Sequence, residues 1–83
     1  MNIDLITPEK KVYSGDAIAV NMPAIDGMVE ILRNHAPLIA ALKIGQLKIT
    51  TKDGVKRYQI KGGFAEVLHN KVVILAEGAE DVA

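Results

Sequence analysis

The sequence predicts an all-β fold, a two-sheet antiparallel β-sandwich of about ten short strands, and three observations support it. Apolar and polar residues alternate with a period of two along most of the chain. Turn residues such as glycine, proline, asparagine and aspartate interrupt this alternation about every ten residues. No segment keeps the 3.6-residue period of a helix. With 83 residues, the chain forms one small domain.

The expected strands are short alternating segments bounded by turn residues. They cover residues 2–7, 11–15, 16–23, 28–32, 46–51, 55–61, 64–68 and 71–76. Residues 38–42 are ambiguous because this apolar run is too short for a helix of its own. Asp53-Gly54 is the clearest hairpin signal in the chain, and Gly62-Gly63 predicts a bend between strands. The acidic end, residues 80–83, is expected to be frayed, which leaves residues 1–79 as the folded domain.

The strand at 71–76 is apolar on both faces. Val72 and Ile74 share one face, whereas Val73 and Leu75 share the other. One face of each sheet in a two-layer sandwich normally meets water. In addition, 49% of the residues are hydrophobic, which exceeds what the core of so small a domain needs. The second apolar face therefore predicts a surface that contacts a partner, or closure into a tighter barrel.

Composition excludes several classes of protein. Ten basic and ten acidic residues give a formal net charge of zero, unlike the one-sided basic field of a nucleic-acid binder. The chain has no cysteine, and therefore neither disulfides nor thiolate metal ligands. No stretch approaches the roughly 20 apolar residues that span a bilayer.

No group of residues in the sequence indicates catalysis or cofactor binding. His35 and His69, the only two histidines, lie in separate predicted turns without carboxylates at helical spacing, so no metal site is predicted. Ser14, the only serine, lies in a strand and lacks the arrangement of an activated nucleophile. The glycines at 62 and 63 precede a strand rather than the Lys-Ser/Thr and helix of a phosphate loop. We therefore expect a non-catalytic interaction module without metal, cofactor or bound nucleotide.

Three segments in register carry a resemblance to a known family. They are TPEKKVYSG (7–15), NHAPLIAALKIGQLKI (34–49) and GGFAEVLHNKVVILAE (62–77). In this order and spacing the chain resembles the amino-terminal β-sandwich of the epsilon subunit of F-type ATP synthase. The resemblance implies a rotor subunit of the central stalk that performs no chemistry. It also implies two partners, the gamma subunit and the ring of c subunits, and a peripheral position on the cytoplasmic face of the bacterial inner membrane.

The resemblance also assigns residues to these two partners. The gamma-binding residues are expected to be Thr7, His35, Ala36, Pro37, Leu38 and Ala40. The c-ring contacts are expected to be Gly27, Met28, Val29 and Glu30. His35 is thus interpreted as part of a turn that shapes a binding surface, and Ala40 is expected to be exposed in the free chain. Met28 and Glu30 depart from the family pattern, since the acid of the c-ring turn has moved by two positions and stays on the same face of the strand.

Most members of the family continue into a two-helix carboxy-terminal domain that inhibits ATP hydrolysis. This chain ends near where that domain would begin. The ending favours a naturally short member, a coupling subunit with no activity of its own. The alternative is a regulatory epsilon subunit whose inhibitory helical domain is missing from this sequence.

Overall fold

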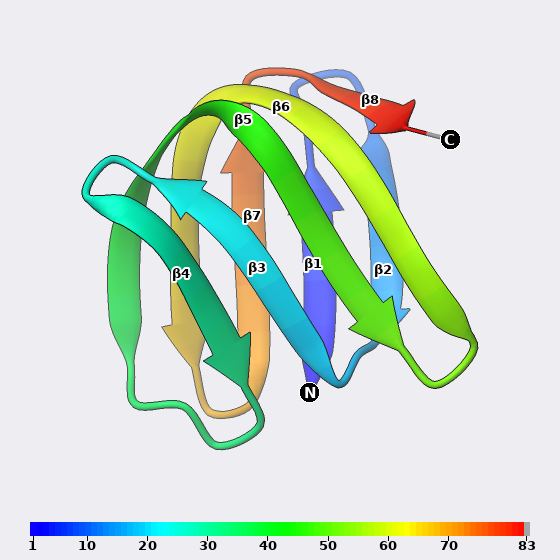
Figure 1. Ribbon diagram of the computed structural model, residues 1–83, viewed down its shortest axis with the longest axis vertical. Helices are drawn as coiled ribbons and strands as arrows, with labels where there is room; N and C mark the ends of the chain where they lie inside the picture. The colour runs from blue at the N-terminus through cyan, green and yellow to red at the C-terminus, as the bar shows by residue number, and fades with distance from the viewer. Residues whose placement is uncertain (83) are drawn as a thin grey trace.

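The structure, a computed structural model, describes residues 1–82 and consists of β-strands joined by short turns (Figure 1). The strands are β1 (Asn2–Ile6), β2 (Lys11–Asp16), β3 (Ala19–Ala24), β4 (Gly27–Leu32), β5 (Leu38–Thr51), β6 (Gly54–Leu68), β7 (Lys71–Ala76) and β8 (Ala79–Val82). The predicted all-β fold is confirmed. Within residues 1–82 there is no helix long and apolar enough to cross a membrane.

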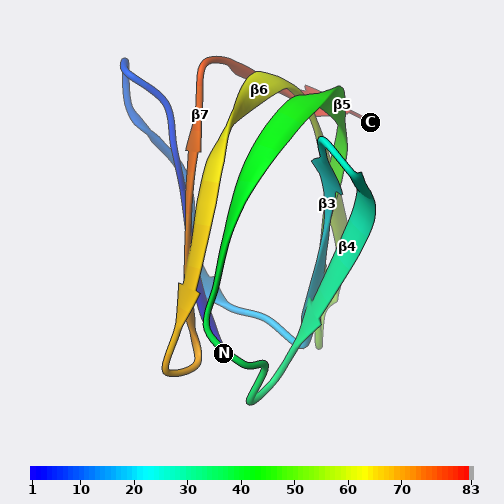
Figure 2. The same cartoon turned by 90° about the vertical axis from the view of Figure 1, so that its left-hand side faces the viewer.

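The long strands β5 and β6 take part in both layers of a sandwich (Figure 2). The first layer has the order β2-β1-β7-β6-β5, and the second has the order β8-β6-β5-β3-β4. Each layer thus contains five strand segments, in agreement with the predicted ten. One pairing differs from the antiparallel prediction, because β1 and β7 run parallel.

β6 changes layers at the two glycines for which the sequence predicts a bend. Ile60 pairs with β8 in the second layer, and Gly63 pairs with Ala76 of β7 in the first. Gly62 and Gly63 have φ values of 108° and 141°, a region that side chains other than glycine rarely adopt. A Cβ on Gly63 would lie 2.9 Å from the Ala76 Cα and would overlap a backbone carbonyl oxygen of β7. The predicted bend is confirmed, and it lies inside a continuous strand.

The buried side of both long strands changes phase at the bend. In β6, the even-numbered Tyr58 and Ile60 are buried before it, whereas the odd-numbered Ala65 is buried after it. In β5, Leu42 is buried before the bend and Leu47 after it, at positions of opposite parity. A period-two pattern read on one side of the bend therefore gives the wrong face on the other side.

The core lies between the layers and is almost entirely aliphatic. Its largest fully buried side chains are Ile3, Leu5, Val20, Met22, Ile31, Leu47, Ile49, Ile60, Val72 and Ile74. On β7, Val72 and Ile74 point inward, whereas Leu75 points outward and is 53% exposed. The prediction of two apolar faces on this strand is confirmed.

The end of the chain differs from the sequence prediction. Residues 79–82 form β8, which pairs with Arg57–Ile60 of β6 and is not a frayed end. The connection is anchored by the Lys61 amide, which donates to the Gly78 carbonyl at 3.1 Å. β8 forms because the edge of β6 offers backbone partners, so little apolar burial is needed. Ala83, also part of the predicted frayed end, lies outside the described residues.

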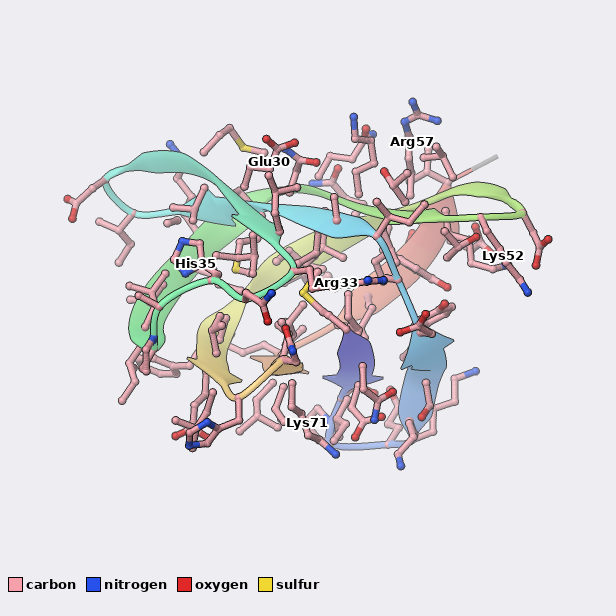
Figure 3. All side chains as sticks on the ribbon, turned by 90° about the horizontal axis from the view of Figure 1, so that it is seen from below. Glu30, Arg33, His35, Lys52, Arg57 and Lys71 are labelled. Carbon is pink, nitrogen blue, oxygen red and sulfur yellow. The ribbon has the colours of Figure 1, made fainter. Side chains whose placement is uncertain are left out.

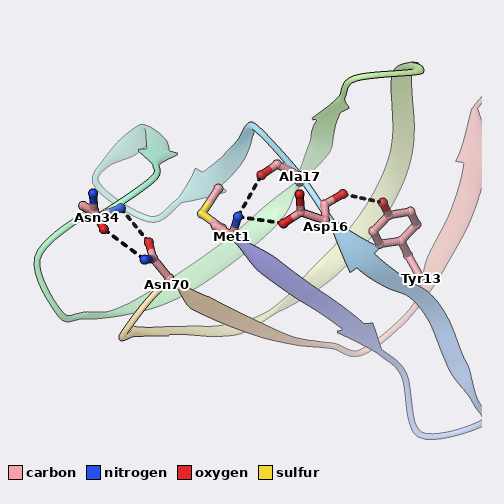
Figure 4. A network of polar contacts seen from close by, with 6 residues as sticks. All are labelled: Met1, Tyr13, Asp16, Ala17, Asn34 and Asn70. Atoms are coloured by element: carbon pink, nitrogen blue, oxygen red, sulfur yellow. Dashed lines mark hydrogen bonds and ion pairs between the residues drawn. The ribbon is translucent and has the colours of Figure 1, made fainter.

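Polar contacts tie the segments at one end of the sandwich together (Figure 4). The amino-terminal ammonium of Met1 donates to a carboxylate oxygen of Asp16 at 2.8 Å and to the Ala17 carbonyl at 3.2 Å. This ammonium holds the pKa of the Asp16 carboxyl below its usual value. The Tyr13 hydroxyl donates to the Asp16 carbonyl at 3.2 Å. The chain between β2 and β3 is thereby fixed where it crosses from the first layer to the second.

Candidate partner-binding surface

The outward side of the first layer is mainly apolar over β5, β6 and β7, and it includes one exposed charged residue, Glu66, which pairs with Ile39 and Val73. Ile39, Phe64, Leu75 and Leu68 are 74%, 61%, 53% and 45% exposed, respectively. Phe64 and Leu75 are direct cross-strand neighbours, and Leu75 in turn lies beside Ile6 of β1. We call the outer apolar face the set Ile6, Ile39, Phe64, Leu68, Val73 and Leu75.

Three shallow depressions run along the outer apolar face. The first, of about 420 Å³, is lined by Thr7, Phe64 and Leu75 among others. The second, of about 230 Å³, shares Phe64 and Leu75 and adds Ile39. The third, of about 380 Å³, continues from Ile39 to Pro37. Because neighbouring depressions share residues, they form one continuous track from the β1–β2 turn to the start of β5.

The second layer has the polar centre that is usual for a sheet facing water. Its outward side carries a cross-strand row formed by Glu30, Asn21, Lys48 and Arg57. The Asn21 side-chain amide donates to a Glu30 carboxylate oxygen at 3.4 Å. Figure 3 shows Glu30 and Arg57 projecting from this side of the sandwich. The apolar centre of the first layer is therefore the exception, and such an apolar patch marks a contact with a partner.

The turn that contains His35 is held in a fixed conformation. Asn34 has a φ of 63°, and its amide donates to the Asn70 side-chain oxygen at 2.7 Å. The Asn70 side chain donates back to the Asn34 side-chain oxygen at 2.9 Å, which joins this turn to the β6–β7 hairpin (Figure 4). The His35 amide donates to the Leu32 carbonyl at 3.2 Å, and Nδ1 lies 2.7 Å from the Ala36 carbonyl oxygen. These contacts agree with the interpretation of His35 as a turn residue.

No metal or catalytic role for His35 is supported by its surroundings. Within residues 1–82 there is no group of three or more histidine, cysteine, aspartate or glutamate residues that could hold a metal ion. The half-buried imidazole contacts backbone groups of its own turn. A metal site would require several convergent ligands.

The predicted gamma-binding residues are only partly brought together. Ala36 and Pro37 are exposed, and His35 is half-buried, at one end of the outer apolar face. Thr7 lies at the opposite end, where its hydroxyl donates to the Lys10 carbonyl at 3.2 Å. The track of depressions joins these two ends.

Leu38 and Ala40, two of the predicted gamma-binding residues, lie on the opposite side of β5 from Ile39, although Leu38 also lines the third depression, and Ala40 is half-buried rather than exposed as expected. They pair with the buried Val67 and Ala65 of β6, and their half-buried side chains pack against the core. Ile39, between them, points outward instead. Alternation along β5 places Ile39 on the opposite side of the strand from its two neighbours, although it does not say which side faces the core. Sequence reasoning also missed Phe64, whose exposure follows from the change of phase at the bend.

Ala40→Glu is therefore expected to destabilise the free domain. The substitution places a carboxylate beside the buried Ala65, and a poorly solvated charge without a partner costs several kcal/mol at full burial. Because Ala40 is half-buried, we expect a loss of about 2 kcal/mol, or roughly 10 °C in melting temperature. Thermal unfolding of Ala40→Glu and of Ala41→Glu, on the outward side, measures the difference. Equal melting temperatures for the two variants would contradict this orientation of β5.

The predicted c-ring residues lie together at the β3–β4 turn, in the second layer. Gly27 has a φ of 127°, a conformation that favours glycine in a turn. Met28, 62% exposed, and Glu30 share the outward face, whereas Val29 packs against the core. The turn also exposes Ile25, which is not among the predicted c-ring residues. The turn is thus a separate surface from the outer apolar face.

A charged group borders the outer apolar face on β1. Asp4, only 9% exposed, accepts a hydrogen bond from the Ser14 hydroxyl at 2.7 Å and lies 3.4 Å from the Lys71 ammonium. The Lys11 ammonium lies 4.0 Å away. The Ser14 hydrogen bond, opposed by desolvation and aided by the two lysines, holds the pKa of the Asp4 carboxyl below its usual 3.8.

We expect the domain to lose part of its stability in acid through Asp4. A carboxyl whose pKa is lower in the folded state stabilises the fold above its unfolded pKa, and this stabilisation is lost as the pH falls through the folded pKa. The loss should therefore develop below about pH 4. Urea unfolding at pH values from 6 to 2 measures the free energy of unfolding. Between these values it should decrease less for Asp4→Asn than for the original chain. An identical pH dependence in both chains would exclude this role of Asp4.

Comparison with known proteins assigns the chain to a family. The family model for the beta-sandwich domain of the ATP synthase delta/epsilon chain matches residues 1–82. The ATP synthase epsilon chain of Chlorobium limicola is 42% identical over 76 residues, which cover 90% of this chain and 86% of that protein. The chain belongs to the ATP synthase epsilon-chain family.

Other epsilon chains match over a smaller part of their own length. The epsilon chain of Symbiobacterium thermophilum is 46% identical over 96% of this chain, but the match covers 58% of that protein. The central-stalk and c-ring structure of the Tetrahymena thermophila mitochondrial ATP synthase contains a chain that superposes with a TM-score of 0.86. That match is 22% identical and covers 98% of this chain and 66% of the other. At this identity the likeness supports the fold alone.

Proposed function

We propose that this epsilon-family chain is a non-catalytic subunit of the rotor of an ATP synthase. It binds the gamma subunit through the outer apolar face and touches the c-ring through the β3–β4 turn. By joining gamma to the ring, it helps to transmit proton-driven rotation to the catalytic head. Its place is then in the membrane-associated F1 sector, on the cytoplasmic face of a bacterial inner membrane.

The outer apolar face is the observation that carries this proposal. Phe64 and Leu75 meet across β6 and β7, and both side chains are more than half exposed. Their burial would contribute roughly 25 cal/mol for each Å² of apolar surface removed from water. Exposed aromatic and aliphatic side chains at the centre of a patch are typical of the residues that carry binding energy. His35 and Thr7, at the two ends of the same track, then form the rim of the gamma contact.

A separate surface is required for a second rotor partner, and the β3–β4 turn supplies it. The Ile25 amide donates to the Ala41 carbonyl at 2.9 Å, which fixes the turn of the second layer to the edge of the first. Met28 and Ile25 are exposed and apolar, and Glu30 stands beside them in the sheet. This arrangement fits a contact with both apolar and charged components, with Gly27 setting the shape of the turn.

Binding to gamma can be tested with an ATP synthase preparation that lacks this subunit. We expect the isolated chain to bind one copy per complex, with the negative heat-capacity change of apolar burial. Calorimetry at several temperatures measures both the stoichiometry and the heat capacity. Absence of binding would contradict the proposal.

The c-ring contact can be tested by disulfide formation, because the chain has no cysteine of its own. We expect Met28→Cys to cross-link with a cysteine introduced in the polar loop of the c subunit. Gln59→Cys, exposed on the same layer but on β6, is the control and should not cross-link. A cross-link from Gln59→Cys alone would place the ring on a different part of the sandwich.

A further inference from the structure

Residues 38–41 of β5 form a free edge of the first layer, because the pairing of β5 with β3 on that side begins at Leu42, which pairs with Ala24. The Ala41 carbonyl accepts from Ile25 of the β3–β4 turn and therefore points away from β6. In an antiparallel strand, the N–H and C=O of one residue point to the same side, and alternate residues point to opposite sides. The uninterrupted register of β5 with β6 from Leu38 to Leu42 preserves this alternation. The N–H and C=O of Ile39 and the N–H of Ala41 therefore point to the free edge.

This edge lacks the features that usually protect the edge of a sheet from pairing with another chain. Charged side chains, proline and bulges are the common protection. The other three edge strands each carry charge: Lys11 and Asp16 on β2, Glu30 on β4, and Glu80 and Asp81 on β8. Residues 38–41 read Leu-Ile-Ala-Ala, without charge, proline or a register shift against β6.

We propose that the gamma subunit adds a short extended segment to this edge as a further strand of the first layer. This inference rests on the proposed binding of gamma to the outer apolar face and specifies its geometry. Strand addition provides main-chain hydrogen bonds for affinity, while side-chain contacts provide specificity. Ile39 belongs to both features, since its side chain lies on the outer apolar face and its backbone groups lie at the free edge.

The surroundings limit the length and the composition of the added strand. Pro37 has no N–H, and the Ala41 carbonyl is already bonded to Ile25, so only about three or four residues of gamma can pair. One face of this segment would continue the outer apolar face. The other would lie beside the half-buried side chains of Leu38 and Ala40. We therefore expect a segment that is apolar on both faces.

Hydrogen exchange at single amides tests the pairing directly. In the free chain, the amides of Ile39 and Ala41 should exchange fast, whereas those of Leu38, Ala40 and Leu42, which bond to β6, should exchange slowly. With the gamma-containing complex bound, we expect the exchange of Ile39 and Ala41 to slow by about 100-fold or more. Binding without this protection would overturn the added strand and leave the proposed function intact. Absence of any binding would overturn both.

A pair of substitutions at Ile39 separates the backbone contribution from that of the side chain. Ile39→Pro removes the free-edge N–H, and proline is tolerated where an edge N–H faces solvent. Ile39→Ala keeps the N–H and removes most of the side chain. We expect Ile39→Pro to bind gamma about tenfold more weakly than Ile39→Ala, since it leaves one hydrogen-bond partner on gamma unpaired. Equal affinities for the two variants, with equal melting temperatures, would overturn the inference.

Discussion

Phe64→Glu is expected to weaken binding to the gamma subunit by on the order of 100-fold while leaving the free domain folded. Phe64 lies at the centre of the outer apolar face, between the two depressions that it shares with Leu75. A glutamate there loses the apolar area of the ring and would have to be desolvated without a cation among its cross-strand neighbours, Ala41 and Leu75. A charge buried without a partner costs several kcal/mol.

The free domain should tolerate the change because the Phe64 side chain is 61% exposed. Surface substitutions of this kind usually change stability by about 0.5 kcal/mol or less. Affinity for the gamma-containing complex and the melting temperature of the free chain are the two measurements. A variant that binds gamma as tightly as the original chain would show that the outer apolar face is not the gamma contact.

Val55→Glu is the matched control for Phe64→Glu. Val55 is also an exposed apolar residue of β6, at 45%, but it lies in the half of the strand that belongs to the second layer. The substitution introduces the same charge into the same strand, away from the outer apolar face. We expect its affinity for gamma to change by less than about threefold. Equal losses in both variants would indicate a general effect of charge on association.

The fold was largely predictable because its signals are local. Alternation of apolar and polar residues marks the strands, and the chain turns where asparagine and glycine stand, as at His69-Asn70 and Asp53-Gly54. The strand β8 was not predictable in this way. It has few apolar residues, and it forms because the edge of β6 provides hydrogen-bond partners from a distant part of the sequence.

The candidate site was less predictable, because its geometry depends on non-local features. The family resemblance placed the His35 turn and the β3–β4 turn on the surface, which the structure agrees with. The resemblance did not distinguish Ile39 from Leu38 and Ala40, because that choice depends on which face of β5 packs against the core. Phe64 is exposed because the buried side of β6 changes at Gly62-Gly63. The alternation of apolar and polar residues does not show this change.

Gly63→Ala is expected to be the most destabilising glycine-to-alanine substitution in this chain. The backbone φ of 141° at Gly63 is strained for any side chain, and a Cβ would overlap a carbonyl oxygen of β7 and lie 2.9 Å from the Ala76 Cα. Both neighbouring atoms belong to the backbone, so they cannot move without breaking the pairing of β6 with β7. We expect a loss of about 4 kcal/mol or more, which is exceptional for a single substitution, and a fall in melting temperature of about 20 °C or more.

Gly54→Ala separates the effect of the overlap from that of the backbone angle. Gly54 has nearly the same φ, 139°, but a Cβ there would meet no atom within 4 Å. Strain of the backbone alone costs about 1–3 kcal/mol, so Gly54→Ala should lower the melting temperature by clearly less than Gly63→Ala. Thermal unfolding of the two variants measures the difference. If both lose the same stability, backbone strain accounts for the whole effect and the close approach of β7 contributes nothing. If Gly63→Ala loses far more, that close approach is what fixes β6 at the point where it passes from the second layer to the first and turns Phe64 outward.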